Sequence, residues 1–176
     1  MFYSAQTGGF YDRAIHGYNI PPDAVEITAN EHADLLAAQS TGKVIQADQN
    51  GKPVAVDPPK PTADDIWRRI KAERDRRKAG GVKVGAKWFH SDDGSRIQQI
   101  GLVMMGASIP AGLQWKTMDG SFVTMTQALA TSVFGAVAAS DQAIFAAAET
   151  HRVAMEASAD PAAYDYSGGW QKIYGE

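Results

Sequence analysis

A short proline-rich segment divides this chain into two parts. Three of the four residues from 58 to 61 are prolines, and Asp57 precedes them. Proline fixes φ and lacks a backbone N–H, so this run cannot lie inside a helix or a central β-strand, and it forms a semi-rigid extended spacer. We therefore predict a small domain over residues 1–57, a linker over 58–62 and a larger domain over 63–176.

The first domain carries the signals of two β-hairpins and one helix. Aromatic pairs at 2–3 and 10–11 flank a glycine-containing turn, and Asn50-Gly51 lies between two β-prone runs. Asn-Gly between such runs is the strongest short-range hairpin signal. Thr28 and Glu31 have the spacing of a capping box, which begins a helix. Residues 1–57 are therefore predicted to form a small α+β unit.

The densest apolar stretch of the chain is residues 82–125, which we expect to form the main core. It holds two of the four tryptophans and four of the six methionines. It reads as two β-hairpins flanking one helix, residues 95–106, whose apolar side chains cover most of its circumference and predict burial nearly all round. An Asp119-Gly120 turn would place Trp115 and Phe122 on one face of the second hairpin.

Two further helices complete the second domain. Thr62 can cap a helix that begins with acidic residues and ends with basic ones, and an alanine-rich helix is predicted from Thr126 to about Ala157. Residues 68–78 contain seven of the seventeen basic residues. Acidic residues share that helix, so we interpret it as a solvated, internally paired surface and not as a nucleic-acid-binding one. The predicted fold class is α+β.

Composition excludes several classes of function. The net charge is −3, so the chain has no overall basic field for nucleic acid or membranes, and the absence of cysteine removes disulfides, thiol catalysis and cysteine-based zinc sites. No uninterrupted apolar run is long enough to span a bilayer, and the first residues lack a signal-peptide pattern. We expect a protein made and kept in a cytoplasm, at least at first.

Candidate catalytic and metal-ligating residues are few. His90-Ser91-Asp92-Asp93 resembles a fragment of a metal site, but several converging ligands are needed, and Asp92 is better explained as a helix cap. A glycan-cleaving enzyme needs paired carboxylates in a cleft, for which Asp92, Asp93 and Asp119 are the candidates. We predict no catalytic residue, no metal and no cofactor.

Longer strings within the chain resemble known families. The run FYSAQTGGFYDRAIHG, with NIPPDAVEIT and QADQNGKPVAVDPP after it, resembles the N-terminal module of bacteriophage tail-fibre assembly proteins. The strings VKVGAKWFHSDD, WKTMDG and DYSGGW are similar to a domain of unknown function that often follows such modules in phages and prophages. Together the two resemblances cover nearly the whole chain.

The resemblance implies a chaperone that binds the distal tip of a trimeric tail fibre and helps it to fold or trimerise. Such a protein acts in the cytoplasm of the bacterial host, and in some relatives it stays on the virion and affects host recognition. The resemblance brings no catalytic residues. The alternative is a structural component of the tail, baseplate or fibre tip, in which the helix over 126–157 forms a bundle with copies of itself.

Two sets of residues are candidates for protein contacts. Aromatic side chains are enriched at protein interfaces. The hypothetical fibre-binding residues are Phe2, Tyr3, Phe10, Tyr11 and Trp88. The hypothetical self-association residues are Leu129, Val133, Val137, Ile144 and Trp170. The competing interpretation is that these side chains close the core of this chain.

Overall fold

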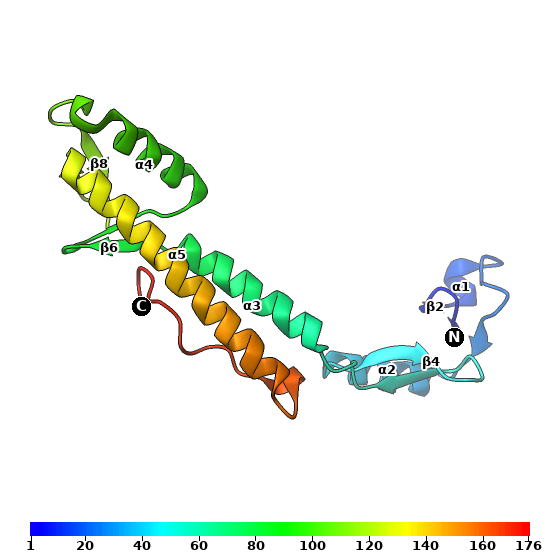
Figure 1. Cartoon of the computed structure of the whole chain (residues 1–176). Helices are drawn as coiled ribbons and strands as arrows, with labels where there is room; N and C mark the ends of the chain where they lie inside the picture. The colour runs from blue at the N-terminus through cyan, green and yellow to red at the C-terminus, as the bar shows by residue number, and fades with distance from the viewer. The chain divides into compact units, whose positions relative to one another are not determined.

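The computed structural model describes residues 1–176 and contains two compact units, Met1–Lys60 and Pro61–Glu176. We call them unit 1 and unit 2 and describe each by itself. Both combine helices with small antiparallel sheets, so the protein is α+β, as predicted (Figure 1).

Unit 1 is built from a three-stranded sheet, a hairpin and two helices. Its elements are β1 (Phe2–Ser4), β2 (Gly9–Tyr11), α1 (Arg13–His16), β3 (Val25–Glu26), α2 (Ala29–Ser40), β4 (Val44–Ala47) and β5 (Pro53–Val56). The sheet order is β2-β1-β3, and β4 pairs with β5. The prediction of a single helix missed α1, and β3 was also missed, because elements of two to four residues leave no periodic pattern.

Local hydrogen bonds explain why unit 1 folds where it does. The Thr28 hydroxyl accepts the Glu31 N–H at 3.1 Å, and the Glu31 carboxylate accepts the Thr28 N–H at 2.6 Å, which is the predicted capping box. The Asp23 carboxylate accepts from the Ser4 hydroxyl and from the Gln6 N–H, both at 2.9 Å. Asp23 therefore fastens the first hairpin to the segment that leads into β3.

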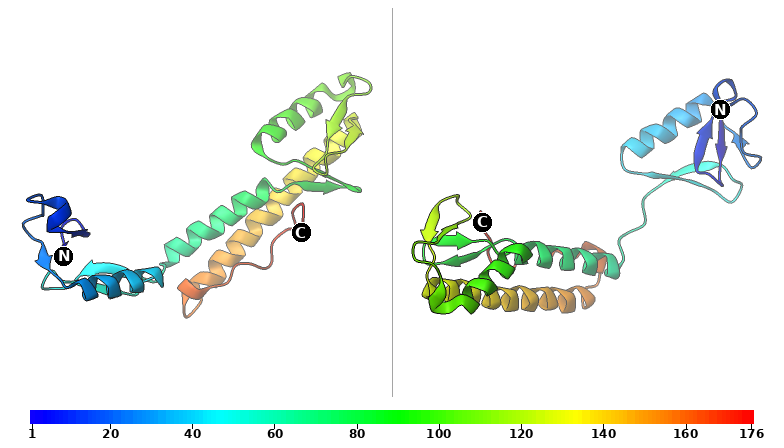
Figure 2. Two further views of the ribbon diagram at one scale, coloured as in Figure 1. Left: turned by 180° about the vertical axis from the view of Figure 1, so that it is seen from behind. Right: turned by 90° about the horizontal axis from the view of Figure 1, so that it is seen from above.

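Unit 2 is organised around two long helices that run side by side (Figures 1 and 2). Its elements are α3 (Ala63–Lys78), β6 (Val82–Val84), β7 (Lys87–Phe89), α4 (Asp93–Met105), η1 (Gly106–Ser108), β8 (Gln114–Lys116), β9 (Phe122–Thr124), α5 (Gln127–Glu156) and η2 (Pro161–Ala163). The helix α5 contacts both α3 and α4. The segment after η2, which we call the tail (residues 164–176), returns toward β6.

One face of α5 contributes buried residues to two hydrophobic clusters. Its first half packs Val133 and Val137 against Val82, Phe89 and other buried residues of the hairpins and α4. Its second half packs Ala148 and Met155 against α3 and the aromatic tail. By length and composition α5 could cross a membrane, with a mean hydropathy of 1.3, but core helices meet the same criterion. In α5, 22% of the most apolar window is buried, and the helix contacts α3 and α4.

The two hairpins of unit 2 differ in how well their register was predicted. In the first, a two-residue turn at Gly85-Ala86 predicts that Val82 faces Phe89, and the structure has this pairing. In the second, Trp115 pairs with Val123, which places Trp115 and Phe122 on opposite faces of the hairpin. The prediction that they share a face was therefore wrong. Hydrogen bonds of the Thr117 and Asp119 side chains to Ser121 close a loop over residues 117–121. This loop shifts the strand pairing by one residue, and such a shift moves the side chains of one strand to the other face.

The prediction that the fourth helix is buried nearly all round was also wrong. Of α4, Gln99 and Leu102 are buried, whereas the side chains of Ile97 and Met104 are 71% and 82% exposed. Apolar residues on every side of a helix indicate burial only if neighbours surround the helix. Here α4 packs mainly on α5 and leaves its other side uncovered.

Arg77 fixes the tail against α3. Its guanidinium donates to the Glu73 carboxylate at 2.6 Å, and to the Gln171 carbonyl and the Glu176 carboxylate at 3.0 Å each. Trp170 stacks near the same group, at 5.6 Å. Close to it, Ile173 packs on Gly80, and the Tyr174 N–H donates to the Gly80 carbonyl at 2.9 Å.

Replacing Gly80 by alanine should weaken the packing of the tail on the end of α3. A Cβ at Gly80 would lie 2.6 Å from Cγ2 and 2.7 Å from Cβ of Ile173, so the tail must move. We expect Gly80→Ala to lower the free energy of unfolding by about 1–3 kcal/mol, measured by urea denaturation. The matched control is Gly135→Ala in α5, where nothing lies within 4 Å; it should stabilise by about 0.5–1 kcal/mol. Equal effects of the two variants would contradict the packing of the tail.

Acidification should weaken the contact between the two hairpins of unit 2. Hydrogen bonds from Lys87, then from Ser121 and Thr117, hold the pKa of Asp119 well below its usual value of 3.8. A depressed pKa stabilises the fold above pH 3.8, and that stability is lost as the pH falls through the folded-state pKa. Asp119→Asn should therefore lose less stability than the wild type on acidification below about pH 4. Parallel curves for the two proteins would contradict this role.

Candidate protein-binding surfaces

The first hairpin of unit 1 separates its four aromatic residues onto two faces. Tyr3 pairs with Phe10, and Tyr3 is only 1% exposed. The Phe10 ring meets His32 of α2 edge-on at 4.6 Å. Phe2 pairs with Tyr11 on the opposite face, where both are half-buried. Of these four predicted fibre-binding residues, Tyr3 is therefore a core residue, and Phe2 and Tyr11 share the partly exposed face.

Phe2 borders a cavity of unit 1. The cavity has a volume of about 610 Å³ and is lined by Arg13, Tyr18 and Ile20, among others. The guanidinium of Arg13 lies 5.3 Å from the centre of the Phe2 ring, and Tyr18 is fully exposed. The sequence analysis did not predict that residues 13–24 line a cavity with Phe2. The aromatic and aliphatic residues in RAIHGYNI, which belong to no predicted helix or strand, could have indicated it.

Unit 1 also presents open strand edges. In the order β2-β1-β3, the outer strands β2 and β3 each have one partner, and β4 and β5 pair only with each other. Unpaired backbone groups at a strand edge can accept an additional strand from another polypeptide. The aromatic face of Phe2 and Tyr11 thus lies on a sheet that can still be extended.

In unit 2, an exposed apolar stripe runs along α4. We call Ile97, Ile100, Gly101 and Met104 the α4 stripe, because their i, i+3, i+4, i+7 spacing puts them on one side of the helix. All four are exposed. A stripe of this spacing is typical of a helix that docks with another polypeptide.

A groove lies between α4 and the β8–β9 hairpin. It has a volume of about 420 Å³ and is lined by Leu113, Trp115 and Phe122 together with polar side chains of α4. Phe122 is 61% exposed, because the observed register turns it away from the core. Phe122 therefore adds a further exposed apolar side chain beside this groove.

Trp88, the fifth predicted fibre-binding residue, belongs to unit 2. It is half-buried on β7, and its ring contacts Tyr174 of the tail at 6.1 Å. It lines a cavity of about 250 Å³ between the β6–β7 hairpin, α5 and the tail. Trp88 is therefore not part of the hairpin surface that carries Phe2.

The residues predicted for self-association lie mostly inside unit 2. Val133 and Ile144 are completely buried, and Val137 is nearly so. Trp170 packs on the second cluster, and its indole N–H donates to the Tyr166 carbonyl at 2.6 Å. Leu129 is half-buried against the first cluster. These apolar side chains are already buried within the chain, so a helical bundle formed through them would require the core of unit 2 to open.

The residues from His90 to Asp92 have structural partners. The Ser91 hydroxyl donates to the Lys78 carbonyl at 2.6 Å, and the His90 carbonyl accepts from the Gln99 amide at 2.7 Å. Asp92 caps α4 through the Ser95 N–H at 3.0 Å. No group of three or more acidic or histidine side chains is arranged to hold a metal ion.

A cavity of about 500 Å³ does contain Asp75, Asp92 and Asp93. Hydrogen bonds from the Arg74 guanidinium lower the pKa of Asp75, and those from the Ser95 hydroxyl and N–H lower that of Asp92. General acid catalysis needs a carboxyl whose pKa is raised toward neutrality. Neither Asp75 nor Asp92 has this property.

The exposed position of the α4 stripe gives a direct test of the surface. Replacing Ile97 or Met104 by serine should change the free energy of unfolding by no more than about 0.5 kcal/mol, since surface substitutions remove few contacts. Leu102→Ala, on the buried side of the same helix, should cost about 2–5 kcal/mol. Chemical denaturation measures both values. A loss of core magnitude in Ile97→Ser would show that this face is covered.

Comparison with known proteins adds two similarities. A "Probable tail fiber assembly protein" of Shigella phage SfV is 49% identical over 65 residues, which are 37% of this chain and 39% of that relative. The match thus spans well under half of the relative's length. No solved structure matches the chain. These findings agree with the resemblance to tail-fibre assembly proteins drawn from the sequence.

The second similarity covers most of unit 2. The family model described as "Domain of unknown function (DUF4376)" matches residues 61–168, which is more than half of the chain. The match begins at the first residue of the second compact unit, so it coincides with a structural boundary. On this evidence, the chain belongs to the DUF4376 family.

Proposed function

We propose that this protein assists the assembly of a phage tail fibre by binding the fibre polypeptide while it folds and trimerises. The observation that carries the proposal is the 49% identity over 65 residues to a probable tail fiber assembly protein. Such a protein would act inside the bacterial host cell during virion assembly. Its activity would be non-covalent binding, with no catalytic step.

The surfaces described above fit this activity. A trimeric fibre exposes strand edges and apolar surface until its chains have associated. Unit 1 offers open strand edges beside Phe2 and Tyr11, and unit 2 offers the α4 stripe. We propose that unit 1 engages the fibre through the face of Phe2 and Tyr11, and that residues 1–57 and 63–176 act as separate domains joined by the proline-rich linker.

Co-expression with the fibre protein of the same phage tests the proposal. The yield of SDS-resistant fibre trimer should fall when this chain is omitted, and should fall several-fold with the double variant Phe2→Ala, Tyr11→Ala, since truncating interface aromatics typically costs about 2 kcal/mol each. Gln39→Ala on the exposed side of α2 is the matched control and should behave as the wild type. Fibre that trimerises equally well without this chain would refute the proposal.

Mass spectrometry of purified particles separates the assembly role from a structural one. A chaperone that leaves after assembly is absent from the particle, whereas a structural component of the tail is present in fixed stoichiometry. Presence in the particle together with normal trimer formation in its absence would favour the structural alternative.

A further inference from the structure

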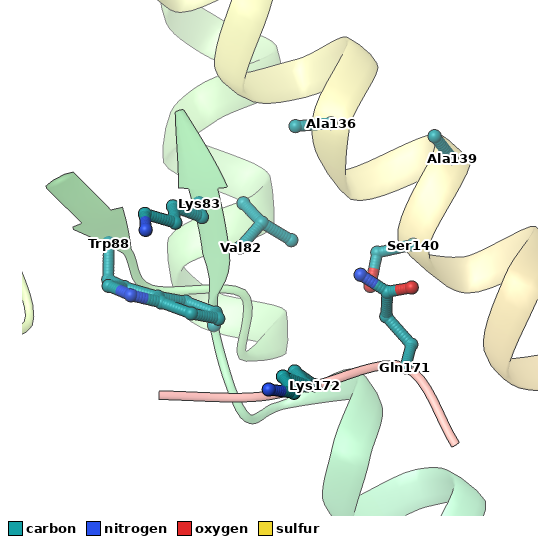
Figure 3. A pocket seen from close by; sticks show the side chains of 9 residues that line it. Val82, Lys83, Trp88, Ala136, Ala139, Ser140, Gln171 and Lys172 are labelled. Carbon is teal, nitrogen blue, oxygen red and sulfur yellow. The ribbon is translucent and has the colours of Figure 1, made fainter. Parts of the chain in front are cut away.

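The cavity beside Trp88 is built by three separate segments of unit 2. Figure 3 shows Lys83 and Trp88 projecting from the β6–β7 hairpin, Ala136, Ala139 and Ser140 from α5, and Gln171 and Lys172 from the tail. Its volume is about 250 Å³. Pockets for drug-sized ligands are usually about 300–1,000 Å³, so this cavity suits one side chain or chain end and not a large cofactor.

Two lysines that line the cavity, Lys83 and Lys172, have no carboxylate partner in the chain. Ion pairs engage Arg77 with Glu73, Lys87 with Asp119 and Arg96 with Asp141, but neither Lys83 nor Lys172 forms one. Both lysines are exposed at the mouth of the cavity. An ammonium group without a carboxylate partner can pair with an anion that enters the cavity.

The other lining groups complement an organic acid. Lys83 and Trp88 are directly paired in the hairpin, so they lie on the same face. The indole of Trp88 and the side chain of Ala136 form an apolar wall, while the Ser140 hydroxyl and the Gln171 amide can bond to oxygen atoms. A carboxylate on a short aliphatic stem matches this combination of charge, hydrogen-bonding groups and apolar surface.

The walls of the cavity are held in place before any ligand binds. The Gln171 carbonyl accepts from Arg77 at 3.0 Å, and the backbone of Tyr174 bonds to Gly80. Tyr174 in turn supports the Trp88 ring. A preorganised cavity loses little conformational entropy on binding, which favours recognition by a few groups.

We propose that this cavity binds a carboxylate presented by an acidic segment of a partner polypeptide, either a glutamate or aspartate side chain or a chain terminus. The identity of that partner as a fibre protein rests on the proposed function, but binding of the carboxylate does not. Lys83 and Lys172 supply the attraction, and Trp88 contacts the stem of the acid. A nucleic acid is a poorer fit, because Arg74, Arg76 and Arg77 of α3 are paired with carboxylates and the net charge of the chain is −3.

Titration of the full chain with short peptides tests the proposal without the fibre. One probe is a peptide with blocked ends and two glutamates, the second replaces both glutamates by glutamine, and the third is the glutamine peptide with a free carboxyl end. The indole N–H signal of Trp88, followed by NMR, should shift with the first or third probe and not with the second. The probe that binds identifies the source of the carboxylate.

Charge-reversed variants provide the matched comparison. Lys83→Glu and Lys172→Glu should each weaken binding of the acidic probe by about tenfold or more, which corresponds to about 1.4 kcal/mol. Lys116→Glu makes the same change in net charge at an exposed residue outside the cavity and should change affinity by no more than about twofold. Thermal unfolding of each variant checks that its fold is intact.

Three outcomes would overturn the proposal. They are equal binding of the glutamate and glutamine probes, equal loss of affinity in Lys116→Glu, and inorganic phosphate competing as strongly as the acidic peptide. If the fibre assay fails while these titrations succeed, the cavity remains a carboxylate site and only the proposed partner is wrong.

Discussion

The buried guanidinium of Arg77 is the interaction on which the arrangement of unit 2 depends. Arg77 is only 8% exposed, and a buried charge is tolerated only when it is paired and fully hydrogen-bonded. Its partners come from α3 itself and from the tail, at Glu73, Gln171 and Glu176. The hydrogen bonds that the Arg77 guanidinium needs therefore hold residues 171–176 of the tail beside β6. That closure also builds the wall of the cavity that holds Lys172.

The division of apolar side chains between core and surface is the second constraint. A single face of α5 supplies buried residues to both clusters, whereas Phe134, Phe145 and Val153 on other sides of this helix are exposed. The helix α4 has equally apolar residues but packs mainly on α5, and the α4 stripe stays exposed. Contiguous exposed apolar patches are rare on monomeric proteins, and those that occur often mark contact sites with other molecules. The exposed apolar side chains of unit 2 include Ile97 and Met104 of α4 and Phe122 of β9, whereas Val133 and Val137 are buried.

The two units offer different chemistry to a partner. Unit 1 combines open strand edges with the half-buried aromatics Phe2 and Tyr11. Unit 2 combines an apolar stripe with a small cationic cavity. Backbone pairing, apolar burial and charge recognition are additive when they act at separate sites. The two units thus present different kinds of contact surface.

The sequence by itself determined the local structure, and the tertiary structure decided which faces are used. Thr28 with Glu31, Thr62 with Asp65, and Thr126 began their helices as predicted, because a cap is satisfied within four residues. The β6–β7 register was also predicted, since a two-residue turn fixes it. The side chains of the 117–121 loop shifted the β8–β9 register, and the exposed face of α4 depends on which helices surround it. The loop bonds are local, but the exposed face of α4 and the cavity lined by Lys83 and Lys172 depend on contacts between residues distant in the chain, which no local pattern encodes.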